Sequence, residues 1–147
     1  MSEPASTLLL ALLLIACFAA FIYFISRYSG WHTLAAHYPL RMPFPKPSDR
    51  FGYAVFRGWI GYNGGVIVAA DSRGLYLRAM PVVLSFCHSP IHIPWSEIRL
   101  IESRRGFFSG AYRIHTVRAP EIEFALRRIT FDAIRDSARR AAVPGEY

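Results

Sequence analysis

Charge is missing from one long stretch of this chain, which runs from Pro4 through Ser26. Its central part, Thr7 to Ile25, also lacks proline and glycine. Leucine, isoleucine, phenylalanine and alanine would surround a helix formed by this stretch, so no polar face is left for water. At ~1.5 Å per residue such a helix covers ~30 Å, the thickness of the hydrocarbon core of a bilayer. We therefore predict a transmembrane anchor over residues 1–28, whose span includes Thr7, Leu14, Phe21 and Ile25.

Cysteine is scarce, and the motifs of many enzymes are absent. Cys17 lies inside the apolar run and Cys87 far from it, so the two cannot form a disulfide framework. Cys87, His88 and His92 lack the spacing of a metal site, and we expect no metal and no cofactor. The chain has no nucleophile elbow, no phosphate loop and no helix-turn-helix, zinc-finger or RNP motif. These absences argue against catalysis and against a nucleic-acid partner.

Basic residues are absent before the apolar run, because all 17 Lys and Arg follow residue 26. A cleaved signal peptide would begin with a basic segment and end at a small-residue cleavage site, so an uncleaved single-pass anchor is favoured. Arg27, Arg41, Lys46 and Arg50 follow the span, and the positive-inside rule then places the N-terminus outside and the domain in the cytoplasm. Lys46 is the only lysine, and this preference for arginine is typical of a GC-rich bacterial genome. The prediction is a bacterial inner-membrane protein.

Aromatic residues mark the exit from the span. Tyr28 and Trp31, together with Arg27, are predicted interfacial anchors, since amphipathic rings prefer the headgroup layer. Trp31 also begins an apolar stripe that continues through Leu34, Ala35 and Tyr38, at the spacing of a short helix. Two interpretations of this helix stay open: it lies on the membrane, or it packs on the domain.

Prolines alternate after this helix, at positions 43, 45 and 47. Such a run lacks the donors of a helix or a central strand and favours extended geometry. We therefore expect residues 29–49 to form a juxtamembrane helix and a Pro-rich linker.

The hydrophobic period changes to two after the prolines, and residues 50–143 read as one domain. Short apolar runs at regular spacing, separated by turn residues, predict about seven antiparallel strands in a barrel or sandwich. Tyr62 to Gly65, with the sequence YNGG, is predicted to be one of the turns. The period then becomes helical, with Thr130 as the expected N-cap of a C-terminal helix. The predicted fold class is a transmembrane helix plus an α+β or mainly β domain capped by a helix.

Two short stretches carry a family resemblance, namely Gly74 to Leu77 (GLYL) and Ile91 to Ile98 (IHIPWSEI). Together with the order of the elements, they resemble the pleckstrin-homology-like superfold in its bacterial PH and GRAM-like forms. The resemblance implies a binding or scaffolding module and not an enzyme. In eukaryotic relatives a basic first hairpin loop binds phosphoinositides. Residues 61–65 contain no Lys or Arg here, so that specificity is not carried over.

Two functions remain open for such a chain. The first is a membrane-anchored scaffold that acts through contacts with a membrane or cytoplasmic protein. The second is direct sensing of anionic lipid by an Arg-rich face, in which the cations sit on phosphates and the rings enter the headgroup layer. The residues expected to make that lipid contact are Arg104, Arg105, Phe107 and Phe108.

Overall fold

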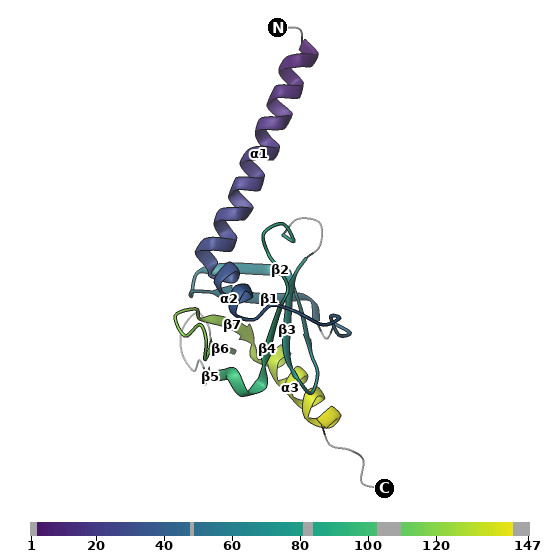
Figure 1. Cartoon of the computed structure of the whole chain (residues 1–147), viewed down its shortest axis with the longest axis vertical. Coiled ribbons are helices and arrows are strands. Elements are labelled where there is room, and N and C mark those ends of the chain that lie inside the picture. The colour runs from purple at the N-terminus through teal and green to yellow at the C-terminus, as the bar shows by residue number, and fades with distance from the viewer. Residues whose placement is uncertain (1–2, 48, 81–83, 103–109, 143–147) are drawn as a thin grey trace.

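One long helix projects from a small barrel-like domain in the computed structural model of the chain (Figure 1). The structure describes residues 3–47, 49–80, 84–102 and 110–142. Helix α1 (Glu3–Ser29) has 27 residues, and large apolar side chains from Leu8 to Phe18 are exposed along it. Within the described part of the chain, α1 is the one helix long and apolar enough to cross a membrane. Its extent confirms the predicted apolar helix.

A seven-stranded antiparallel sheet forms the domain, in the order β4-β3-β2-β1-β7-β6-β5. The strands are β1 (Asp49–Phe56), β2 (Ile60–Ala70), β3 (Gly74–Ala79), β4 (Ile91–Pro94), β5 (Ile98–Glu102), β6 (Ala111–Thr116) and β7 (Phe124–Arg127). A short 3-10 helix, η1 (Trp95–Glu97), joins the two end strands, and α3 (Arg128–Ala142) lies at the end of the sheet opposite α1 (Figure 1). The predicted fold class is confirmed, with α3 beginning ahead of the expected cap, Thr130.

The predicted turn at residues 62–65 is wrong, because β2 continues through it. In the pairing of β1 with β2, Gly52 faces Val66 and the next residue, Tyr53, faces Asn63. The intervening glycines are extra residues on β2, and Gly64 adopts a φ of 69°. A bulge in an antiparallel pair uses the same positive φ as a hairpin turn. The chain reverses instead at residues 57–59, where Arg57 has a φ of 51° and Phe56 pairs with Ile60.

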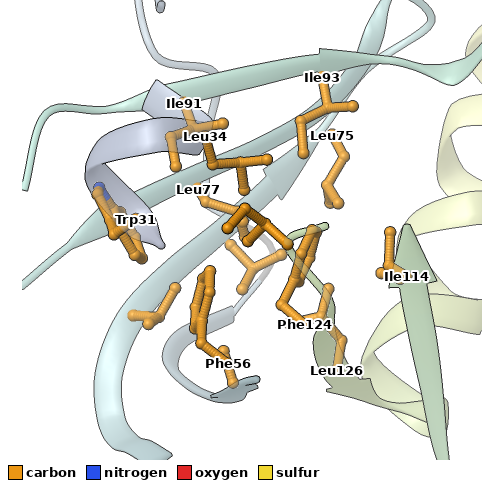
Figure 2. Close-up of a cluster of buried hydrophobic side chains, with 14 of the residues drawn as sticks. Trp31, Leu34, Phe56, Leu75, Leu77, Ile91, Ile93, Ile114, Phe124 and Leu126 are labelled. Atoms are coloured by element: carbon orange, nitrogen blue, oxygen red, sulfur yellow. The ribbon is translucent and has the colours of Figure 1, made fainter. Parts of the chain in front are cut away.

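Buried and partly exposed side chains alternate along a strand, and the buried ones fill the interior of the barrel. In β6, for example, Tyr112, Ile114 and Thr116 are buried while the residues between them are partly exposed. Figure 2 shows side chains from the helix that follows α1 and from strands of the sheet meeting in one cluster. Complete burial of one large apolar side chain contributes about 1.5–3 kcal/mol. The labelled members are Trp31, Leu34, Phe56, Leu75, Leu77, Ile91, Ile93, Ile114, Phe124 and Leu126.

The short helix α2 (Trp31–His37) belongs to this core, which settles the choice between the two interpretations of its apolar stripe. Residues 38–47 then run along β4 and β3. The His92 N–H donates to the Tyr38 carbonyl at 3.0 Å, and the ring of Phe44 lies 6.1 Å from that of Tyr76. The packed core therefore begins upstream of residue 50, and the Pro-rich segment lies against the sheet.

Candidate functional site

The end of α1 is built into the domain. Ile22, Ser26 and Ser29 lie on one face of its last two turns and are buried, although the rest of the helix is mostly exposed. The Ser26 hydroxyl donates to the backbone carbonyl of Cys87, in the connection between β3 and β4. Two serines at this spacing therefore lie at the contact between the helix and the barrel. We call this region the junction; it comprises residues 22–31, the turn at 57–59, Tyr62 and residues 84–89.

A buried chain of hydrogen bonds crosses the junction. The Tyr62 hydroxyl lies 3.0 Å from Ser29 Oγ and 3.0 Å from His88 Nε2, while His88 Nδ1 lies 3.0 Å from the Phe86 carbonyl oxygen. Because a carbonyl only accepts, Nδ1 carries the ring proton. Nε2 of the neutral ring then accepts the hydrogen bond from the Tyr62 hydroxyl. The side-chain polar atoms of Ser29, Tyr62 and His88 in this network all have hydrogen-bond partners, and these bonds join α1, β2 and the β3–β4 connection.

The two ionisable groups of this hydrogen-bonded network, Tyr62 and His88, are held neutral. Burial raises the pKa of Tyr62 to about 12, against a smaller lowering by the hydrogen bond with Ser29. Burial also lowers the pKa of His88, although hydrogen bonds with the carbonyls of Phe86 and Leu84 oppose that shift. At neutral pH neither group is charged. The network therefore joins α1 to the domain through hydrogen bonds between uncharged groups.

A sharp bend separates α1 from α2. Gly30 adopts a left-handed conformation with a φ of 86°, and its N–H donates to the Arg27 carbonyl at 3.3 Å. A Cβ at this position would lie 2.5 Å from Cδ1 of Ile122, which is fully buried. Only glycine tolerates both the conformation and this close approach. The residue after the bend, Trp31, donates through Nε1 to the Ser89 carbonyl at 2.8 Å.

An apolar groove of about 340 Å³ opens beside the junction. One wall belongs to α1 and the other to the turn between β1 and β2. Trp59, at the edge of the groove, is 74% exposed. The groove is lined by Phe21, Phe24, Ile25, Tyr28, Trp59 and Ile60.

A second hollow, of about 430 Å³, lies between the end of α2 and β4, with Arg41, His92 and Arg118 in its lining. Arg118 is already occupied there. Its Nη2 lies 2.6 Å from Oε1 of Glu97, and its guanidinium covers the Tyr38 ring at 4.9 Å from the centroid. Hydrogen bonds with Arg118 and Tyr38 lower the pKa of Glu97. Arg118 therefore connects η1 with the end of α2.

The two stretches that carried the family resemblance lie side by side. Gly74 pairs with Pro94 across β3 and β4, and the Trp95 indole N–H donates to the Asp71 carbonyl at 2.8 Å. The Asp71 carboxylate accepts from the Tyr76 hydroxyl at 3.0 Å. Burial alone would raise the pKa of Asp71, but hydrogen bonds from the Arg73 and Gly74 N–H groups and from Tyr76 outweigh burial and lower it. These hydrogen bonds join the turn after β2 to β3 and to the residue that follows β4.

The predicted site residues have different outcomes. Thr7, Leu14 and Phe21 are exposed on α1, and Ile25 is partly buried against the domain. Arg27 and Tyr28 are exposed near the junction, where an interfacial role remains a prediction. For Trp31 that role is wrong, because its ring is fully buried in the core, against Phe56, Tyr62 and His88.

The predicted lipid-contact loop, Arg104, Arg105, Phe107 and Phe108, lies outside the described residues. Its flanking residues are described. Glu102 pairs with Tyr112, and the Gly110 carbonyl accepts from the N–H of Arg128, the first residue of α3, at 2.8 Å. Both flanks therefore lie at the α3 end of the barrel.

Sequence reasoning missed the members of the junction. Ser26 and Ser29 carried a signal, since two hydroxyls on one face at the end of an apolar helix need buried partners. Nothing in the sequence pairs them with Tyr62 and His88, which come from other elements. In the described ranges no three His, Cys, Asp or Glu residues gather closely enough to hold a metal ion.

Comparisons with known proteins give no relative from which to argue. No protein-family model, no curated protein and no solved structure matches the chain. The seven antiparallel strands and the C-terminal helix are compatible with the pleckstrin-homology-like superfold. Fold alone does not determine function.

Proposed function

We propose that this chain is a non-enzymatic scaffold protein, anchored in a membrane by α1, whose barrel binds a protein partner at the membrane surface. The observation that carries the proposal is the burial of Ile22, Ser26 and Ser29 in the domain. A helix that needed only to tether its domain would leave it through an exposed linker. This helix instead ends inside the domain, so a bilayer that holds α1 would also hold the barrel close to its surface.

The proposed orientation follows the distribution of cations. Arg27 is exposed in the last turn of α1, and Arg41, Lys46 and Arg50 follow within the next segment. No Lys or Arg precedes the helix. By the positive-inside rule the barrel faces the cytoplasm, in a bacterial cell the inner face of the inner membrane.

A protein partner is favoured over anionic lipid by what lies at the α3 end. The side chain of Ile129 is 84% exposed there, and it neighbours the exposed cations Arg127 and Arg128. This end faces away from α1 (Figure 1). An exposed apolar side chain that follows two arginines in the sequence suits a protein surface that offers an apolar contact with acidic neighbours. The flanks of the 104–108 loop lie at the same end, which disfavours lipid sensing through that loop.

Photo-crosslinking of the full chain in native membranes tests this function. Benzoylphenylalanine is placed at position 129, with position 10 on α1 as the lipid-facing control. We expect a discrete protein adduct from position 129 and lipid adducts from position 10. The scaffold proposal fails if position 129 and further exposed positions of the domain, such as 36 on α2 and 73, yield no protein adduct while α1 is shown to be in the bilayer.

A further inference from the structure

Two large apolar side chains of the barrel are exposed on the connections that flank α1. Trp59, in the turn between β1 and β2, is 74% exposed, and Phe86, in the β3–β4 connection, is 60% exposed. In Figure 1 these connections lie on either side of the lower end of α1. A tryptophan exposed to water does not gain the favourable free energy that burial of its large ring would give. In the headgroup layer its amphipathic ring is stabilised.

The residues that line the groove give the position of Trp59 along the axis of α1. Phe21, Phe24 and Ile25 share the groove with Trp59, so the indole stands beside the last apolar turns of the helix. At ~1.5 Å per residue, Phe21 lies roughly 6 Å deeper along the helix axis than Ile25, the end of the apolar run. If α1 spans a bilayer, Trp59 and Ile60 therefore lie at the boundary between the hydrocarbon and the headgroups.

The chemistry of the groove matches that depth. None of the six described residues that line it is charged. The nearest cations in the sequence are Arg27 before Tyr28 and Arg57 before Trp59, and both are exposed. An apolar groove whose lining residues have arginines close to them in the sequence is complementary to a phospholipid, whose acyl chains lie beneath a phosphate.

We propose that a bilayer phospholipid occupies this groove, with an acyl chain between α1 and Ile60 and with Trp59 and Phe86 inserted into the headgroup layer. The occupant is argued from continuity, because the α1 wall of the groove belongs to the same apolar surface that lipid covers along the rest of the helix. The inference rests on the proposed membrane anchoring. It places a lipid contact at the junction.

Tryptophan quenching in proteoliposomes tests the lipid-filled groove. The full chain is reconstituted in phosphatidylcholine–phosphatidylglycerol vesicles, with and without phospholipids brominated near the glycerol end of the acyl chains. We expect bromine to quench part of the tryptophan emission, and we expect Trp59→Phe to remove that quenched part. Trp95→Phe is the matched control: Trp95 donates to Asp71 in the turn between β2 and β3, and its loss should leave the bromine quenching unchanged.

The other outcomes separate this inference from the proposed function. The inference is overturned if Trp59→Phe leaves the bromine quenching unchanged, or if aqueous acrylamide quenches Trp59 in the vesicles. It is also overturned if a photoreactive residue at position 59 crosslinks to a second copy of the chain in place of lipid. Flotation of the same vesicles, with resistance to alkaline extraction, reports on α1 independently. A chain that floats but lacks the quenched component contradicts the groove alone, and a chain that fails to float contradicts the membrane anchor itself.

Discussion

At the scale of single residues, the junction depends on side chains that meet only in the folded chain. Trp31 is the largest of the fully buried side chains, and its ring lies 5.4 Å from Phe56, 5.6 Å from Tyr62 and 5.4 Å from His88. Its indole N–H is satisfied by the Ser89 carbonyl. The ring therefore connects the hydrophobic core with the buried polar chain.

Replacing Trp31 should be among the most destabilising single changes in the domain. Trp31→Ala leaves a cavity and an unpaired Ser89 carbonyl, and we expect a loss of about 3–5 kcal/mol in the free energy of unfolding. Urea denaturation of the full chain in mild detergent, followed by near-ultraviolet circular dichroism, measures this loss. Trp59→Ala is the matched control and should change the stability by well under ~1 kcal/mol in detergent. Equal effects of the two variants would contradict the assignment of Trp31 to the core.

The buried imidazole predicts a pH dependence. Burial lowers the pKa of His88 below its ordinary value of 6.5, so the unfolded chain binds a proton there that the folded chain does not. The free energy of unfolding should therefore fall as the pH drops below about 6.5, by at most ~1.4 kcal/mol per pH unit for one proton. Burial shifts His92 in the same direction, against the opposing charge of Asp71. Asp71 itself contributes only near and below pH 3.8.

Thermal unfolding of the full chain between pH 7.5 and 5.5 checks this dependence. His88→Gln keeps a donor and an acceptor but removes the titration, so its unfolding temperature should vary less with pH than that of the wild-type chain. His92 still titrates in the variant, which leaves a residual slope. Identical slopes in the two proteins would show that His88 does not couple protonation to folding.

At the scale of elements, hydrophobic periodicity predicted the long apolar helix, the β domain and the C-terminal helix. It failed where one local pattern fits two environments. The stripe that begins at Trp31 suits a membrane surface as well as a core, and only the barrel places Phe56 and Tyr62 around it. The glycines at 64 and 65 suit a hairpin turn as well as a bulge, and the pairing of Phe56 with Ile60 decides between them. The junction could not be predicted, because Ser29, Tyr62 and His88 come from three separate elements.

The bend between α1 and α2 gives a prediction at the same scale. Gly30→Ala places a methyl group in the left-handed region and against the buried Ile122, and we expect a loss of about 1–3 kcal/mol. Thermal unfolding of the full chain in detergent measures it. Combining Gly30→Ala with Ile122→Ala makes room for the new methyl group. The two losses should therefore add up to more than the loss in the double variant. Simple additivity would contradict the close contact.

At the scale of the whole molecule, the apolar helix and the barrel form one body. The buried face of α1, the bend at Gly30 and the burial of α2 all precede the Pro-rich segment, which packs along the sheet. Movement of the barrel relative to α1 would break the hydrogen bonds of Ser26 and Ser29 and expose Ile22. A membrane that holds α1 would therefore hold the barrel at a fixed height, with its α3 end turned away from the bilayer.

The most direct test of this rigid arrangement is a distance distribution between spin labels in lipid nanodiscs. One label is attached to the exposed native Cys17 on α1 and the other to Ser72→Cys, at the exposed turn after β2, in a Cys87→Ser background. A flexible Gly-Ser insertion after Ser29 provides the reference for a tethered domain. We expect a single narrow distance in the uninterrupted chain and a broad distribution in the insertion variant. A broad distribution in both would contradict the fixed barrel, and with it the basis of the proposed scaffold.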